Sequence, residues 1–304
     1  MYDSILVPTD GSDTAESAAD HALALADAFD ARLHALSAVD IDDEAGAFDA
    51  GGVDDEFLAE LEADAETAVD SIAGLAGDRP VETAVLRGDP AAAITEYVAE
   101  RDVDLAVMGT HGRTGISRVL TGSTSAQMVR EGSVPVVTVR ETDGRPSTSY
   151  DDIMIPTDGS PPAEAAIDHG IAVADAFDAT VHALSVVDTT ALAGGADATV
   201  PGGGGGGGVA TGDLLDPLLS RGEDATDLVA ERAREAGLTV TTEVTEGSPG
   251  SALLEYAETE SVDFVAMGTH GYTGIDRVLL GSTTERLIRN ASVPVMSVRT
   301  EDGA

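Results

Sequence analysis

The sequence predicts an α/β protein made of two tandem, doubly wound, Rossmann-like domains, each with a five-stranded parallel sheet in the order 3-2-1-4-5. An internal repeat gives the number of domains, because residues 5–40 realign without gaps on residues 153–188, with about two positions in three identical. The order of apolar segments gives the fold class. Short strand-like stretches alternate with helix-like stretches in both halves, which is typical of a parallel sheet with helices on both faces.

Each element of the first half has its own local signal. Short apolar stretches rich in Val, Ile and Leu predict strands at 4–9, 31–39, 81–88, 104–110 and 134–140. Ala-rich segments with apolar residues at helical spacing predict helices at 13–29, 57–77, 91–102 and 123–133. The repeat transfers the same order of elements to the second half.

Two segments of biased composition set the domain boundaries. A polar stretch with Gly and Pro divides the chain into a first domain at 1–142, a linker at 143–149 and a second domain at 150–304. The second domain carries an insertion at about 194–213, with seven consecutive glycines at 202–208. Because polyglycine sustains neither a helix nor a strand, we expect a flexible surface loop there.

The composition is strongly acidic. The chain has 56 Asp and Glu residues against 16 basic residues, all of them Arg, and its net charge is −40. Since duplex binding needs basic side chains to neutralise phosphates, this balance argues against nucleic-acid binding. A dispersed acidic surface without Lys resembles the proteins of salt-loving microbes, where molar salt screens like charges, and it predicts a halophilic archaeal source.

The sequence also bears on location. No apolar run approaches the ~18 residues that span a membrane, and the N-terminal residues lack the basic and apolar regions of a signal peptide. Cysteine is absent, which rules out disulfides and thiolate metal sites. We therefore expect a cytoplasmic protein without membrane contact.

Two polar clusters follow strands of the first half. The cluster "PTDGS" (8–12) follows the first strand and "GTHG" (109–112) follows the fourth. In the order 3-2-1-4-5 these strands flank the point where the strand order reverses, so the clusters would face one crevice. The spacing G-x2-G-x9-G-S presents backbone N–H groups and a helix N-terminus, which suit a polyphosphate. Tight turns alone are the alternative explanation of these glycines.

The charge distribution favours an anion site near these loops. Residues 109–140 contain four Arg and one acid, and residues 268–299 contain four Arg and two acids. These two segments are therefore net positive within a strongly negative chain, and a locally positive region favours the binding of an anion. The alternative is that some of these arginines pair with acids of the other domain, which suits Arg140 and Arg299 best.

The clusters together resemble the universal stress protein family, and more narrowly its ATP-binding branch in a tandem form. The resemblance rests on "PTDGS", "MGTHG", G-x2-G-x9-G-S and the closing "SVPVVTVR" and "SVPVMSVR", and covers nearly the whole chain. It implies an ATP-binding, nucleotide-dependent regulator of the stress response, with Mg2+ or Mn2+ bridging the phosphates. It also implies pairing of the two fifth strands, hence an intramolecular pseudo-dimer that could assemble further into a homo-oligomer.

The resemblance implies binding residues in both halves. Those of the first half are Pro8, Thr9, Asp10, Ala38, Met108, Gly109, His111, Gly112, Arg113, Gly122, Ser123 and Ser125. Those of the second half are Pro156, Thr157, Asp158, Val186, Met267, Gly268, His270, Gly271, Gly281, Ser282 and Thr284. Arg113 has Tyr272 as its counterpart, which predicts weaker phosphate binding in the second half.

Several alternatives stay open at this point. Asp10 could cap the first helix, and His111 and His270 could be part of the loop structure. The other histidines are expected to be structural, namely His21, His34, His169 and His182. No triad or paired carboxylates stand out, so we expect no enzyme, although slow ATP hydrolysis is compatible with the site. A nucleotide-free interaction module, a sensor of another adenine nucleotide and an ATP pyrophosphatase-like enzyme are the rival functions, and the last fits "PTDGSDTAES" poorly.

Overall fold

The computed structural model describes most of the chain in both halves. The described residues are 1–40, 55–110, 123–140, 147–189, 211–271 and 280–300. The first half contains β1 (Ser4–Pro8), α1 (Asp13–Phe29), β2 (Arg32–Val39), α3 (Asp55–Leu75), β3 (Val81–Arg87), α4 (Pro90–Glu100), β4 (Leu105–Gly109), α5 (Ser123–Glu131) and β5 (Val136–Val139). These elements occupy the segments predicted from the sequence.

The second half repeats this series of strands and helices. Its elements are β6 (Asp152–Pro156), α6 (Pro161–Phe177), β7 (Thr180–Asp188), α8 (Thr211–Glu235), β8 (Val240–Gly247), α9 (Pro249–Thr259), β9 (Phe264–Gly268), α10 (Ser282–Asn290) and β10 (Val295–Val298). The loop predicted through residue 213 is three residues too long, because α8 already begins at Thr211. Good helix formers, Leu214 and Leu215, follow closely and favour this early start.

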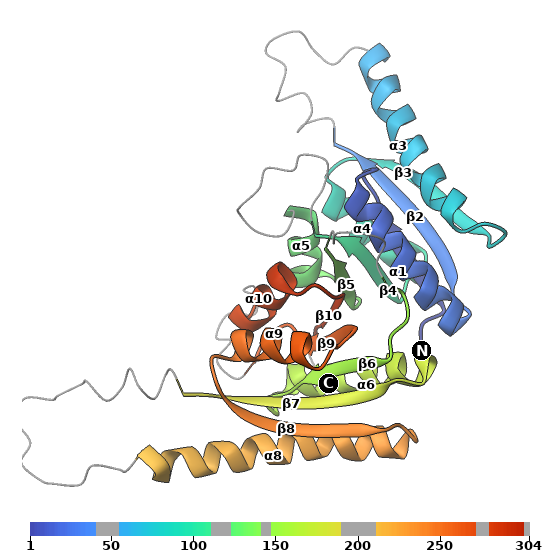
Figure 1. Cartoon of the computed structure of the whole chain (residues 1–304). Helices are drawn as coiled ribbons and strands as arrows, with labels where there is room; N and C mark the ends of the chain where they lie inside the picture. Colours follow the sequence, from blue (N-terminus) through green and yellow to red (C-terminus); the bar gives the residue numbers. More distant parts are fainter. Residues whose placement is uncertain (41–54, 111–122, 141–146, 190–210, 272–279, 301–304) are drawn as a thin grey trace, which may run out of the picture.

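The two halves share one sheet. Its ten strands lie in the order β3-β2-β1-β4-β5-β10-β9-β6-β7-β8 (Figure 1). Numbered within each half, the strands follow 3-2-1-4-5 from either outer edge of the sheet toward its centre. The five strands expected in each half are present, and the two sets form one continuous sheet because β5 and β10 pair.

The central strand pair holds the halves together. Strands β5 and β10 run antiparallel, with Val137 opposite Met296 and Thr138 opposite Val295. The Thr138 hydroxyl also donates a hydrogen bond to the Val295 carbonyl oxygen, at 3.1 Å. This pairing confirms that the fifth strands meet within one chain, and it covers two strand edges that would otherwise be exposed.

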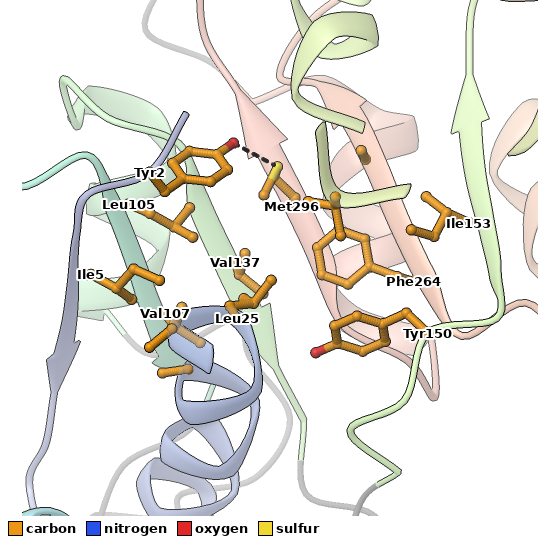
Figure 2. Close-up of a cluster of buried hydrophobic side chains, with 14 of the residues drawn as sticks. Tyr2, Ile5, Leu25, Leu105, Val107, Val137, Tyr150, Ile153, Phe264 and Met296 are labelled. Atoms are coloured by element: carbon orange, nitrogen blue, oxygen red, sulfur yellow. Dashed lines mark hydrogen bonds between the residues drawn. The ribbon is translucent and has the colours of Figure 1, made fainter. Parts of the chain in front are cut away.

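Helices cover both faces of the sheet. Helices α1, α3, α6 and α8 bury their apolar residues in one cluster with strand residues such as Ile5 and Val7. Helices α4, α5, α9 and α10 pack against residues such as Leu6 on the opposite face. The first cluster continues across the junction, where Leu105 and Val137 face Phe264 and Met296 (Figure 2). The core is therefore shared between the halves.

Two reciprocal Tyr–His hydrogen bonds cross the junction between the halves. The Tyr2 hydroxyl lies 2.6 Å from Nδ1 of His169, and the Tyr150 hydroxyl lies 2.7 Å from Nδ1 of His21. Tyr2 also donates to the Met296 sulfur at 3.7 Å (Figure 2). Both histidines lie on the first helix of their half, so the predicted structural role is confirmed and consists in joining the two halves.

The strand histidines are structural as well, but their partners differ between the halves. His34 lies 3.0 Å from both the Ser4 hydroxyl and the Tyr97 hydroxyl. His182 instead lies 2.9 Å from an Asp152 carboxylate oxygen and 2.9 Å from the Tyr256 hydroxyl. In each half a strand-two histidine thus links the first strand to the helix that follows the third strand.

Candidate nucleotide site

A cavity of about 520 Å³ lies at the carboxyl ends of the second-half strands. Strand β6 has β7 on one side and β9 on the other, so the strand order reverses beside β6. Ligands of open α/β sheets bind at such a point, outside the carboxyl ends of the strands. The volume falls within the ≈ 300–1,000 Å³ range that is typical of small-molecule pockets.

The structure brings the predicted second-half residues together around this cavity. The lining includes Pro156, Thr157, Asp158, Val186, Met267, Gly268, His270, Gly271, Gly281, Ser282 and Thr284. These residues come from β6, β7, β9, α10 and the segments that follow β6 and β9. The two polar clusters of this half therefore do face one crevice.

Close backbone contacts explain why glycine occupies two of these positions. A Cβ added to Gly271 would lie 2.5 Å from Oδ2 of Asp158, so the two loops touch at this point. A Cβ added to Gly281 would lie 3.0 Å from the Thr269 carbonyl oxygen, which also accepts the Gly281 N–H at 2.9 Å. Any side chain here would push the loops apart or fill the space beside the cavity.

The N-terminus of α10 is fixed against the end of β9. The Thr284 hydroxyl is buried and donates to the Gly268 carbonyl oxygen at 2.9 Å. Gly281 is the N-cap residue of α10 and provides no side-chain acceptor for the free N–H groups of the first turn. The helix therefore presents these N–H groups and the positive end of its dipole at the cavity.

The aspartate after the first strand is not a helix cap. In the second half the N-cap is Ser160, whose hydroxyl accepts the Ala163 N–H, while Asp158 accepts the Ser160 N–H at 2.9 Å. In the first half Ser12 is the N-cap, and Asp10 accepts its N–H at 3.1 Å. The alternative that Asp10 caps the first helix is therefore wrong.

His270 has one nitrogen paired and one nitrogen unpaired. Its Nδ1 lies 2.9 Å from the Thr269 hydroxyl, whereas its Nε2 is buried without a hydrogen-bond partner among the described residues. A buried unpaired ring nitrogen is costly and is expected to find a partner. Within the part of the chain that the structure describes, no group of three or more His, Asp or Glu side chains could hold a metal ion.

The structure adds residues to the cavity lining that the motifs in the sequence did not identify. They are mainly Leu218 and Arg221 of α8, Ser248, Pro249, Gly250 and Leu253 at the start of α9, and Arg286 of α10. The start of α9 follows β8, whose carboxyl end lies at the same edge of the sheet as those of β6 and β9. The topology could have predicted this contribution, because the segment after the third strand must also open onto the crevice.

The first-half counterpart is described in part. Pro8 ends β1 and is followed by Thr9 and Asp10, Ala38 lies near the end of β2, and Met108 and Gly109 end β4. Ser123 begins α5, and Ser125 is buried in its first turn. The remaining predicted residues, His111, Gly112, Arg113 and Gly122, lie outside the described residues.

Fold and site together define a tandem Rossmann-like α/β protein with a ligand-sized cavity at the switch point of its second half. The profile of the universal stress protein family matches residues 1–140 and 149–299. The chain therefore belongs to the universal stress protein family.

No helix among the described residues is long and apolar enough to cross a membrane.

Individual relatives agree with this assignment. Universal stress protein MJ0531 of Methanocaldococcus jannaschii is 40% identical over 151 residues, which are 49% of this chain and 82% of that protein. A universal stress protein of Mycolicibacterium smegmatis is 31% identical over 209 residues, covering 66% of this chain and 63% of that protein. The crystal structure of a universal stress protein from Archaeoglobus fulgidus has a TM-score of 0.66 at 20% identity, covers 98% of this chain and 97% of that chain, and shows the same fold.

Proposed function

We propose that this protein binds ATP at its two related sites and acts as a nucleotide-dependent regulator of the stress response rather than as a fast enzyme. The observation that carries the proposal is the second-half cavity, where Asp158, the loop after β9 and the uncapped N-terminus of α10 meet. The tandem repeat extends the proposal to the first half, which has an aspartate, a glycine and a helix N-terminus at the matching positions.

The phosphate end of the ligand fits the glycine-lined side of the cavity. Helix α10 begins at Ser282, and helix N-termini bind phosphates through the free N–H groups of the first turn and the dipole. A Cβ at Gly271 or Gly281 would crowd this space. The side chain of His270 adds a ring nitrogen that still needs a partner. A divalent Mg2+ or Mn2+ would be held mainly by the phosphates themselves.

The nucleoside end fits the part of the cavity lined by Asp158 and by apolar side chains. Asp158 offers carboxylate oxygens that can accept hydrogen bonds from ribose hydroxyls. Leu253 and Met267 are buried apolar residues that border the cavity, and Val186 lies near the end of β7. Apolar walls with a few polar groups are the usual composition of such pockets.

The proposal includes the setting of the protein. We propose a cytoplasmic location in a halophilic archaeon, since the net charge of −40 suits a high-salt interior. It includes no hydrolytic role, because no Ser-His-Asp triad or pair of carboxylates stands out in the sequence.

Isothermal titration with ATP in molar KCl tests the proposal. We expect two ATP molecules per chain, and we expect Asp10→Ala and Asp158→Ala each to remove one of the two. Asp168→Ala is the control, because Asp168 is an exposed residue of α6 that pairs with Arg232. Absence of ATP binding by the wild type would refute the proposal. Binding of cyclic AMP in preference to ATP would favour a sensor of another adenine nucleotide, and binding of neither nucleotide would favour an interaction module.

A further inference from the structure

We infer that Arg286 is the phosphate-binding cation of the second-half site, and that Gly250 is glycine because the Arg286 side chain occupies the space that a Cβ would need. This inference rests on the proposed nucleotide binding and deepens it. It assigns to a helix side chain the role that the family resemblance implies for the first-half residue Arg113, whose counterpart in the sequence is Tyr272.

The position of Arg286 on α10 directs it toward the cavity. Arg286 lies four residues after Ser282, so the two residues share one face of the helix. Helical side chains tilt toward the N-terminus of their helix, which here is the end that borders the cavity. Arg286 is exposed and lines the cavity together with Ser282 and Gly281.

The contact with Gly250 fixes the course of the arginine side chain. A Cβ built on Gly250 would lie 2.7 Å from Cδ, 3.2 Å from Cβ and 3.3 Å from Cγ of Arg286. The apolar stem of Arg286 therefore packs against the first turn of α9. Since Gly250 and Gly281 both border the cavity, the stem runs between the N-terminal turns of α9 and α10.

Asp158, Asp188 and Arg221 also line the cavity, and it is the side where α9 and α10 begin that favours an anion. The N-cap residues of both helices, Ser248 and Gly281, make no side-chain capping hydrogen bond. Arg286 forms no ion pair with a described residue, whereas Arg289, one turn later, pairs with Glu285. Two helix N-termini and a guanidinium group thus border the same cavity, and all three attract negative charge.

The matching region of the first half is built differently. There Asp89 caps α4 by accepting the Ala92 N–H at 2.8 Å, so a carboxylate stands where the second half has Ser248. Ala91 is buried at the position of Gly250. Gln127 stands at the position of Arg286, and its amide donates to Glu131 at 3.0 Å along its own helix. The second half therefore differs at all three positions together: it lacks the acid and the Cβ, and it has the arginine.

The test uses the full chain with the first site removed by Asp10→Ala. In this background Arg286→Gln, which copies the first-half residue, is titrated with ATP and with adenosine in molar KCl. We expect a loss of about tenfold or more in ATP affinity, the size of one charge-assisted contact, and a change of less than about twofold for adenosine. Arg289→Gln is the matched control on the same helix and should change neither affinity.

A second variant tests the role of the glycine. Gly250→Ala should weaken ATP binding as well, since the added Cβ displaces the arginine stem, while circular dichroism shows an intact fold. Unchanged ATP affinity in Arg286→Gln, or an equal loss for ATP and adenosine, would overturn the inference and leave the proposed function standing. Failure of the parent chain to bind ATP would overturn the proposed function together with the inference.

Discussion

The two halves of the protein share their strands and differ at the edge of their sites. Residues 5–40 and 153–188 are close copies, and both halves have the same order of strands and helices. Four differences concern the third helix, the fourth helix and the segment after the fourth strand. They are Asp89 against Ser248, Ala91 against Gly250, Gln127 against Arg286 and Arg113 against Tyr272. The comparison teaches that the two halves share the framework of the site and differ in the charged residues at these positions.

The core shows a similar difference in the strands beside the junction. Leu105 of β4 and Phe264 of β9 occupy matching positions, and both are fully buried. The Phe264 ring lies with its centroid 5.0 Å from that of Tyr150 (Figure 2). The first half thus places an aliphatic side chain at a point where the second half has an aromatic contact.

The largest expected effect comes from truncating these two residues. Phe264→Ala should lower the free energy of unfolding by about 3–5 kcal/mol and Leu105→Ala by about 2–5 kcal/mol, with the loss at Phe264 the greater. The reason is the larger cavity and the lost contact with the Tyr150 ring. Urea unfolding at constant molar KCl, followed by circular dichroism, measures both.

An exposed leucine provides the control for the two buried truncations, Phe264→Ala and Leu105→Ala. Leu75 is 41% exposed at the end of α3, so Leu75→Ala should cost less than about 0.5 kcal/mol. If Leu105→Ala proved more destabilising than Phe264→Ala, the prediction would be wrong. The Phe264 side chain of β9 would then not contribute more to the free energy of unfolding than the Leu105 side chain of β4.

The histidines at the junction predict a pH effect of intermediate size. Burial lowers the pKa of His21 from 6.5 to about 4, and burial also lowers the pKa of the less buried His169. The folded state therefore keeps these rings neutral at pH values where the unfolded chain binds protons. The free energy of unfolding should fall as the pH drops from 6.5 toward 4, by up to about 3 kcal/mol for His21.

Glutamine variants separate this effect from the titration of the many carboxylates. His21→Gln keeps a polar group beside Tyr150 but cannot titrate, so its unfolding free energy should depend less steeply on pH than that of the wild type. His169→Gln should show the same change to a smaller extent. Parallel pH profiles for the wild type and His21→Gln between pH 4 and 6.5 would contradict the prediction.

Much of the fold could be predicted from the sequence because it depends on local and repeated signals. Apolar strands and Ala-rich helices set the order of elements, and the repeat showed that the halves are alike. The pairing of β5 with β10 was predicted from the family resemblance. The Tyr–His hydrogen bonds depend on contacts between residues far apart in the chain, such as Tyr2 and His169, which local patterns do not show.

The candidate site was predictable where a motif marked it. Asp158, Gly271 and Gly281 belong to repeated motifs, and the structure places them around one cavity. Gly250 and Arg286 belong to no such motif and meet only because α9 packs beside α10. Their contact is visible only once the helices are placed in space, which explains why the comparison of Arg113 with Tyr272 alone suggested a weaker second site.

The smallest expected effect concerns the helix that follows the third strand in each half. Asp89 caps α4, whereas Ser248 leaves α9 without a side-chain cap. Asp89→Ala should therefore lower the free energy of unfolding by about 1 kcal/mol, and Ser248→Ala should change it by only a few tenths. Thermal unfolding of both variants in molar KCl, monitored by circular dichroism, measures the difference.

Introducing the first-half aspartate at position 248 tests whether this capping difference also affects ATP binding. Ser248→Asp copies the first half and should stabilise the fold by about 0.5–1 kcal/mol, since a carboxylate caps the helix and suits its dipole. The same carboxylate borders the second cavity, so it should repel the phosphates and weaken ATP binding there while adenosine binding is kept. Ser248→Asn, a neutral cap, should give most of the stability without the loss of ATP affinity. If Ser248→Asp raised stability and left ATP binding unchanged, the start of α9 would lie too far from the phosphates to matter, and the difference between the halves at this position would concern stability alone.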